Sequence, residues 1–420
     1  MDFQNPYIVV IAVCLILILS YQFNWISKIS RIPSVLLLIL LGIGIRIGLD
    51  YLDVRTGNLM SLLQVIGIVG LIMIVLEASL ELELKREKRT LILKSFFLSL
   101  FSLGACIVFI TWLLNRFVID DLFSAILYSV PLSVVSSAIV IPSVGSLLKQ
   151  KREFLIYEST FSDILAIMVF FYLLSNINMA SVGSIVLNVS VNLGITIILS
   201  VVIGYVMVIL LDKLQSQVKL FLLIAVLVLL YSIGKLFHFS SLVMILVFGI
   251  ILNNSPIFFS GRMKRWIDLP ALKVVQNDFQ ILTMESTFFI RTFFFVIFGI
   301  TLELGNLLDK RAALISLAII SGIYLIRAVI LKIFMVKRIF PEVFVSPRGL
   351  ITILLFFSIP VSYQSLSFNP GILLYVILIT SMIMALSLMV KGRDREYAEK
   401  LNFGDWDELD KEIDQLSKKK

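Results

Sequence analysis

The most unusual polar cluster of the chain is Glu158-Ser-Thr-Phe-Ser-Asp163, which interrupts an otherwise apolar run over residues 153–176. Ser159 and Asp163 are four residues apart, as are Glu158 and Ser162, so each pair lies on one face of a helix. Carboxylate and hydroxyl oxygens are hard ligands, which suit a hard cation or a proton. The cluster therefore predicts an ion site centred on Asp163, with Ser159 and Ser162 beside it.

The run that carries this cluster is long enough to cross a bilayer, which takes roughly 20 apolar residues. At a rise of about 1.5 Å per residue, Asp163 lies about 15 Å into the run, near the midplane. A carboxylate there costs about 3 kcal/mol even on a lenient insertion scale. Asp163 therefore needs a partner or a function.

The composition is that of a membrane protein. The 420 residues are 59% hydrophobic and 15% charged, whereas soluble domains have about 45–50% apolar and 25% charged residues. The net charge of +8 comes from basic residues grouped between apolar runs, so we expect no nucleic-acid binding. With one histidine, two distant cysteines and no Walker loop, we expect no resident cofactor and no ATP-driven chemistry.

The apolar runs predict an all-α polytopic fold with about thirteen transmembrane helices. Basic residues fall mainly in alternate connections, which places the N-terminus outside and the C-terminus in the cytoplasm and requires an odd number of spans. Residues 391–420 are expected to form a short charged cytoplasmic tail. The expected spans are 7–24, 33–51, 59–83, 91–114, 122–148, 153–176, 182–211, 217–234, 238–253, 277–303, 311–335, 345–361 and 371–390.

Matching segments indicate two repeats within a transmembrane domain of residues 1–390. Val-Leu-Glu-Ala-Ser-Leu-Glu-Leu ends the third span and Ile-Phe-Gly-Ile-Thr-Leu-Glu-Leu ends the tenth. The third and tenth spans are seven positions apart, an odd number, so they point in opposite directions, as inverted-topology repeats require. We expect repeats over about 1–176 and 217–390, joined by a linker helix over about 182–211.

The fifth and twelfth spans carry helix-breaking residues at corresponding positions of these repeats. The fifth contains Pro131 and Pro142, and the twelfth contains Ser346-Pro-Arg-Gly and Pro360. Transporters place unwound helices at such positions, where they cross near the midplane and turn free backbone groups toward the site. The alternative is a pair of ordinary proline kinks.

Other ionisable residues lie in the spans at depths of about 8–12 Å from the cytoplasmic side. We expect a structural ion pair between Glu158 and Arg327, with Arg348 as the competing partner, which leaves Asp163 without a permanent cation. Glu77 is either a structural hydrogen-bonding group or part of the ion path. For Arg291 we expect a partner in another span or in a dimer interface.

Five segments together resemble the monovalent cation:proton antiporters, nearest to the bacterial sodium/proton exchangers of the NhaP type. Residues 158–163 resemble the family segment Glu-x-x-x-Asn-Asp, and residues 76–83 resemble Phe-Glu-Gly-x-Leu-Asn-Leu-Asp. Ser136-Ser-Ala-Ile-Val is similar to the broken-helix Thr-Asp-Pro and to Ser-Ser-Thr-Ala-Ile-Val of the potassium-efflux branch. Arg327 matches the arginine that pairs with the Glu of the first segment, and Arg348-Gly matches the second broken helix.

The resemblance implies a secondary transporter, not an enzyme, that exchanges a monovalent cation for H+, with Na+ as the first candidate. It also implies a role in pH homeostasis. The cation or the proton would bind Asp163, near Ser136 and Ser137 of the broken helix, with Glu77 on the ion path. Ser162 stands where the exchangers have Asn and the electrogenic branch has a second Asp, which favours electroneutral exchange. The resemblance also implies a homodimer in a bacterial inner membrane. K+/H+ exchange, a cation channel without proton coupling and a non-transporting membrane sensor are the alternatives.

Overall fold

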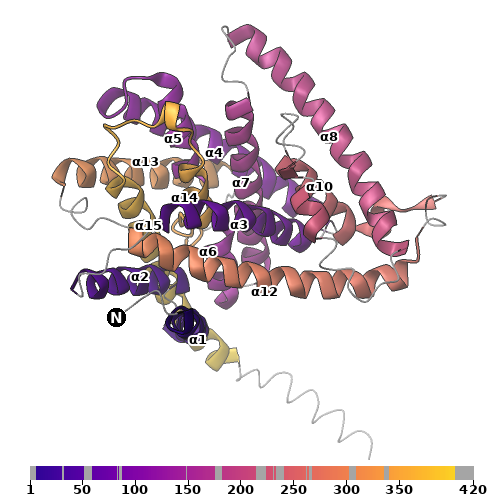
Figure 1. Ribbon diagram of the computed structural model, residues 1–420, viewed down its shortest axis with the longest axis horizontal. Coiled ribbons are helices and arrows are strands. Elements are labelled where there is room, and N and C mark those ends of the chain that lie inside the picture. Colours follow the sequence, from indigo (N-terminus) through magenta and orange to yellow (C-terminus); the bar gives the residue numbers. More distant parts are fainter. Residues whose placement is uncertain are drawn as a thin grey trace, which may run out of the picture.

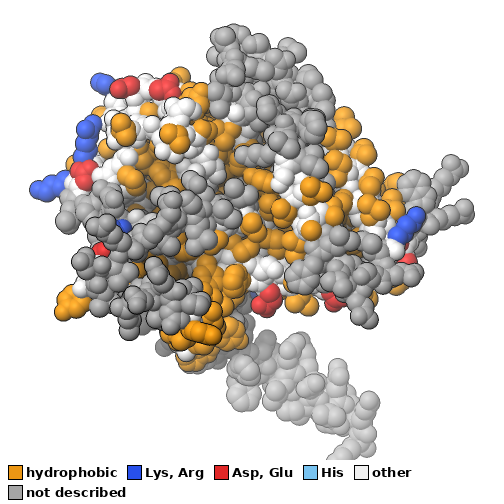
Figure 2. All heavy atoms as spheres, in the orientation of Figure 1, with side chains coloured by type: hydrophobic (Ala, Val, Ile, Leu, Met, Phe, Trp, Pro, Cys, Tyr) orange, Lys and Arg blue, Asp and Glu red, His pale blue; other side chains and the backbone are white. Residues whose placement is uncertain are grey.

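The computed structural model of this protein describes residues 6–30, 33–51, 59–82, 84, 88–147, 149–175, 182–213, 224–229, 231–232, 241–261, 263, 267–301, 309–334 and 340–402. The regular elements within these residues are helices (Figure 1), as the sequence predicts. Eight of them are long and apolar enough to cross a membrane. Figure 2 shows hydrophobic side chains over much of the described surface, with charged groups mostly near its edges.

One set of helices, which we call the α12 group, packs around the long helix α12 (Figure 1). α12 contacts α1, α2 and α3, and α10 packs between α3 and α8. The α2–α12 contact brings backbones together, because a Cβ atom at Gly42 would lie 2.2 Å from the Val296 carbonyl oxygen. The members are α1 (Pro6–Ser30), α2 (Ser34–Tyr51), α3 (Leu59–Glu81), α8 (Val182–Lys213), α10 (Ser241–Asn253) and α12 (Leu269–Thr301).

A second set, which we call the α7 group, packs around α4 and α7. α4 contacts α5, α7 and α13; α13 contacts α15; and α14 packs against α5 and α7. The members are α4 (Arg89–Phe117), α5 (Leu122–Ser133), α6 (Ser137–Ser143), α7 (Lys149–Ser175), α13 (Lys310–Phe334), α14 (Leu350–Phe357) and α15 (Gly371–Asn402). Short helical turns lie at η2 (Val144–Ser146), α11 (Ser255–Phe258) and η5 (Val361–Tyr363), and residues 224–229 are also helical.

Several expected spans differ from the helices that the structure describes; the tenth, for example, begins at Leu269 rather than at residue 277. The twelfth span, 345–361, contains only the eight helical residues of α14, because the residues before Leu350 are not helical. The last helix does not end with the apolar run near residue 390 but continues to Asn402. The eighth span, 217–234, lies largely outside the described residues.

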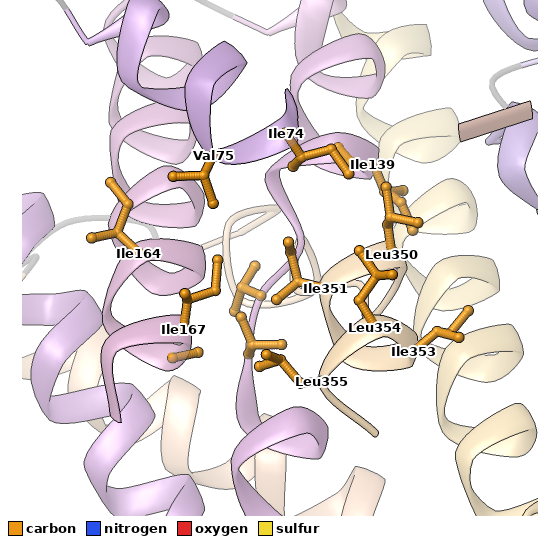
Figure 3. Packing of buried hydrophobic residues seen from close by; sticks show 14 of the residues in the cluster. Ile74, Val75, Ile139, Ile164, Ile167, Leu350, Ile351, Ile353, Leu354 and Leu355 are labelled. Atoms are coloured by element: carbon orange, nitrogen blue, oxygen red, sulfur yellow. The ribbon is translucent and has the colours of Figure 1, made fainter. Parts of the chain in front are cut away.

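The two groups meet at an apolar interior between α3, α6, α7 and α14. Figure 3 shows Val75 of α3, Ile164 and Ile167 of α7 and Ile351 and Leu355 of α14 turned toward this shared space. Within a bilayer, lipid tails are as apolar as these side chains, so close packing rather than the hydrophobic effect holds the helices together. This interior surrounds the polar cluster with branched aliphatic side chains.

Candidate functional site

The helix that the sequence places over residues 122–148 is broken between α5 and α6. Val134 and Ser136 have extended backbone angles, with φ and ψ of −71° and 137° and of −78° and 114°. In a continuous helix, the N–H groups of Ser136 and Ser137 would donate to the carbonyl groups of Leu132 and Ser133, four residues earlier. Four buried backbone groups therefore need other partners.

Arg348 supplies the partners for the two carbonyl groups. Its Nε donates to the Leu132 carbonyl at 3.0 Å and its Nη2 donates to the Ser133 carbonyl at 3.0 Å. Nη1 donates to both the carbonyl and the hydroxyl of Ser346 at 2.7 Å. The guanidinium thus caps the C-terminal end of α5, where the helix dipole favours positive charge.

Of the two partners that the sequence offers for Glu158, Arg327 and the alternative Arg348, the structure pairs it with Arg327. Among the ion pairs of the described residues, Arg348 takes part in none. The break in the helix frees two neighbouring carbonyl oxygens, and the planar fork of a guanidinium can reach both. Arg348 is therefore committed to the backbone of the broken helix.

The N–H groups of the break are satisfied by α7 and by the segment before α14. Ser137 N donates to Asp163 Oδ2 at 2.9 Å, and Val135 N donates to the hydroxyl of Ser162 at 2.9 Å. Ser136 N donates to the Pro347 carbonyl at 3.0 Å. Asp163 thus lies at the positive N-terminal end of α6 while Arg348 lies at the negative end of α5.

The two non-helical segments approach each other closely at Gly349. A Cβ atom there would lie 2.5 Å from Ile139 Cδ1 and 2.9 Å from the Ser136 hydroxyl oxygen. Only a residue without a side chain fits between them without displacing a neighbour. The prolines themselves lie within α5 and α6, so the break is held by these cross-contacts rather than by a proline kink.

Asp163 keeps one carboxylate oxygen without a partner. The side chain is 2% exposed, and Oδ1 has no hydrogen-bond partner among the described residues. The same holds for the hydroxyl oxygens of Ser136 and Thr160. Because buried polar groups are normally hydrogen-bonded, such atoms need an explanation, and a bound ion or proton supplies one. Thr160 was missed in the sequence, although its position three residues before Asp163 places it on the same helix face.

Glu158 and Arg327 form a separate, fully buried pair. Arg327 binds both carboxylate oxygens of Glu158, with Nη2 at 2.9 Å from Oε2, and each residue is 1% exposed. Nε and Nη2 of Arg327 also donate to the Glu342 carbonyl at 3.1 and 3.0 Å, and Nη2 donates to the Val345 carbonyl at 2.9 Å. The pair therefore ties α7 and α13 to the segment that leads into α14.

A further buried carboxylate, Glu342, was not recognised in the sequence. Its side chain is 1% exposed and forms an ion pair with Lys151 in the first turn of α7. The same segment thus binds Arg327 through a backbone carbonyl and α7 through a side chain. No sequence signal marks Glu342, because it lies outside the continuous apolar runs.

Glu77 lies at a cavity of about 190 Å³ between the two helix groups. Its Oε1 is 3.6 Å from Nη2 of Arg291 on α12. Ser137 lines the opposite wall, and its N–H is the donor to Asp163. The hydroxyl of Ser159, in contrast, donates to the Ile156 carbonyl of its own helix at 3.1 Å.

The structure therefore brings Asp163, Ser162, Ser136 and Ser137 together at the break. Glu77 lies across a cavity from this cluster, and Glu158 with Arg327 forms a neutral pair apart from it. The arrangement offers a single buried carboxylate oxygen to a cation or a proton.

Comparison with known proteins gives a consistent picture. A search of curated proteins finds no match. Among solved structures, the sodium proton antiporter MjNhaP1 from Methanocaldococcus jannaschii at pH 8 has a TM-score of 0.68 at 17% identity, over 93% of this chain and 100% of that chain. An electron microscopy map of the same antiporter gives a TM-score of 0.62 at 17% identity, over 94% and 96% of the two chains. The family model for the transmembrane region of sodium/hydrogen exchangers matches residues 10–391, which is nearly the whole chain. The chain therefore belongs to the sodium/hydrogen exchanger family of membrane antiporters.

Proposed function

We propose that this protein exchanges Na+ for H+ across the membrane, and that the two ions bind Asp163 in turn. The observation that carries the proposal is the buried Oδ1 of Asp163, which has no partner among the described residues. A carboxylate in this position holds either a proton or an alkali cation, but not both. Competition for one oxygen is enough to couple the two fluxes.

The charges around Asp163 support this role. The two buried guanidinium groups of the described residues are engaged elsewhere, Arg327 by Glu158 and Arg348 by the carbonyl groups of α5. Among the residues that the structure describes, Asp163 thus has no permanent counter-charge. An empty, charged Asp163 is costly to move through an apolar barrier, so the loaded forms cross most readily.

We further propose that the exchange is electroneutral, with one cation for one proton. Ser162 uses its hydroxyl to accept a hydrogen bond from Val135, so this position adds no second negative charge to the site. One carboxylate then carries one positive charge in either direction. Ser136, Ser137, Ser159 and Ser162 are proposed as oxygen donors or as the frame that positions them.

The packing of the helices supports a moving part and a stationary part. The cavity is lined by α1, α2, α3 and α12 on one side and by α6 on the other, so it lies at the seam between the groups. We propose that the α7 group moves against the α12 group and opens Asp163 to each side of the membrane alternately. Glu77 lies on the ion path along this seam.

We propose an architecture of thirteen spans, with inverted repeats over about 1–176 and 217–390 and a linker over about 182–211. Support comes from the two non-helical segments, 134–136 and 345–349, which meet at the site as such repeats require. The remaining proposals are a homodimer in a bacterial inner membrane, an outside N-terminus, a cytoplasmic tail over 391–420, and no resident cofactor.

The test is transport by the full chain in proteoliposomes, with an imposed gradient of Na+ and a pH-sensitive dye inside. We expect Na+ entry to drive stoichiometric H+ exit, Asp163→Asn to abolish it, and the exposed Asp278→Asn on α12 to leave it intact. Wild-type exchange in the Asp163 variant would remove this residue from the mechanism. Faster exchange with K+ than with Na+ would assign the cation differently, and cation flux without proton flux would indicate a channel.

A further inference from the structure

The cavity between the helix groups contains a second charged pair with properties unlike those of the buried one. We propose that Arg291 sets the affinity of the cavity for the incoming cation by neutralising and positioning Glu77. The proposal rests on the antiport function proposed above and names a residue that determines how the cation enters. Arg291 is a positioning residue in this role, because it acts through Glu77.

The geometry of the pair is loose. Arg291 Nη2 and Glu77 Oε1 are 3.6 Å apart, and the two side chains are 19% and 16% exposed. Arg327 and Glu158, in comparison, are sealed at 1% and 2% exposure and joined by two hydrogen bonds. The first pair can therefore be reached from the cavity and separated, whereas the second cannot.

This pair supplies the only charged side chains among the described residues that line the cavity. Among the described lining residues, Glu77 and Arg291 are the ionisable ones, so the pair leaves the cavity with no net charge. The other polar lining residues are Asn24, Ser34, Ser137 and Thr292. A cation in this space thus experiences one negative and one positive group at close range.

The position of the pair connects the cavity to the binding carboxylate. Glu77 and Arg291 belong to the α12 group, and Ser137 on the other wall donates its N–H to Asp163. A cation that enters the cavity can replace Arg291 beside Glu77 and then pass to Asp163 across the Ser137 wall. Transport needs entry that is favourable and release that is not too slow, and the guanidinium prevents Glu77 from holding the cation too tightly.

This role predicts opposite effects of the two single variants on the apparent KM for Na+. One uncompensated unit charge beside the cavity changes cation affinity by roughly three- to tenfold. Arg291→Gln should lower KM by this factor, Glu77→Gln should raise it, and the double variant should return near the wild-type value. Arg291→Lys keeps the charge and should keep KM, as should Lys273→Gln, which removes an exposed charge from the same helix.

The measurement is Na+-driven proton flux in proteoliposomes of the full chain at one fixed pH, at low and at high choline chloride. Because salt screens charges over about 8–10 Å near physiological strength, high salt should shrink the differences. Na+-dependent thermal shifts of the same purified variants provide a readout that does not require transport. KM changes in the same direction for both single variants, or no change in either, would overturn the proposal. Failure of the antiport function itself gives a different result, with no exchange in the wild-type protein.

Discussion

Replacing Arg327 by alanine tests how the charged interior is held together. The substitution removes two hydrogen bonds to the Glu158 carboxylate and the donors to the Glu342 and Val345 carbonyl groups. Glu158 is 1% exposed, so its charge would remain in the interior without a partner. Because α7 carries both Glu158 and Asp163, we expect loss of stability before any specific effect on transport.

The expected size follows from the burial of the pair. Removing one partner of a buried ion pair costs about 3–5 kcal/mol. At about 2.1 cal/mol/K per residue, the unfolding entropy of a chain of 420 residues is about 0.9 kcal/mol/K. A loss of about 4 kcal/mol therefore lowers the apparent melting temperature by roughly 4 °C.

The assay is thermal unfolding of the purified protein in detergent at one fixed heating rate, for a double-mutant cycle. The cycle uses Arg327→Gln, Glu158→Gln and the two together. We expect the double variant to lose less than the sum of the singles, because it leaves no unpaired charge. Ser321→Ala, an exposed position on the same helix, serves as the matched control.

Additive effects would refute this reasoning. If the single losses sum to the double loss within about 0.5 kcal/mol, the two residues are not coupled. The two residues would also be uncoupled if Arg327→Ala had the same melting temperature as the Ser321→Ala control. Additive losses would mean that Arg327 stabilises the protein only through the backbone carbonyl groups. An Arg327→Ala variant that melts with the control would mean that neither the carboxylate nor the carbonyl contacts contribute to stability.

Three further predictions concern the frame of the site. Arg348→Ala should leave the two carbonyl groups at the end of α5 without donors, which costs about 1–3 kcal/mol for each unsatisfied group. We therefore expect exchange in proteoliposomes to fall at least tenfold. Gly42→Ala should destabilise the α2–α12 contact by about 1–3 kcal/mol in detergent melts, whereas Gly44→Ala, where a Cβ meets nothing within 4 Å, should melt like the wild type. Asp121→Ala removes the N-cap bond from Ser124 N and should cost about 1 kcal/mol near neutral pH. Hydrogen bonds from Ser124 lower the pKa of Asp121, so the capping contribution is present above the ordinary aspartate pKa and disappears as the pH falls through the lowered value; melts at a series of acid pH values check the sign.

Much of the site could be predicted from side-chain types and depth. Asp163 is recognisable because a carboxylate in the middle of an apolar run is rare, and Glu158 and Arg327 because their depths in separate spans are similar. The breaks are recognisable from paired helix-disfavouring segments in the fifth and twelfth spans. These inferences depend only on position along a helix of known rise.

The remaining features depend on contacts that a sequence pattern does not display. Arg348 binds backbone carbonyl groups, which every residue carries, so no side-chain pattern identifies its partners. The pairing of Arg291 with Glu77 is also hidden in the sequence. The two residues lie more than two hundred residues apart and meet only because α3 packs on α12. Glu342 looked like part of a connecting loop, and its burial follows from the packing of that loop on α7.

The guanidinium at the end of α5 has a consequence for how the site would distinguish ions. Unwinding a helix usually exposes carbonyl oxygens that can strip water from a metal ion, as in the filters of potassium channels. Here Arg348 occupies those oxygens and adds a positive charge beside them. If a cation binds Asp163 as proposed, it would then keep part of its hydration shell on that side. Selectivity among the alkali ions would rest on the size of a partly hydrated ion rather than on a close cage of carbonyl groups.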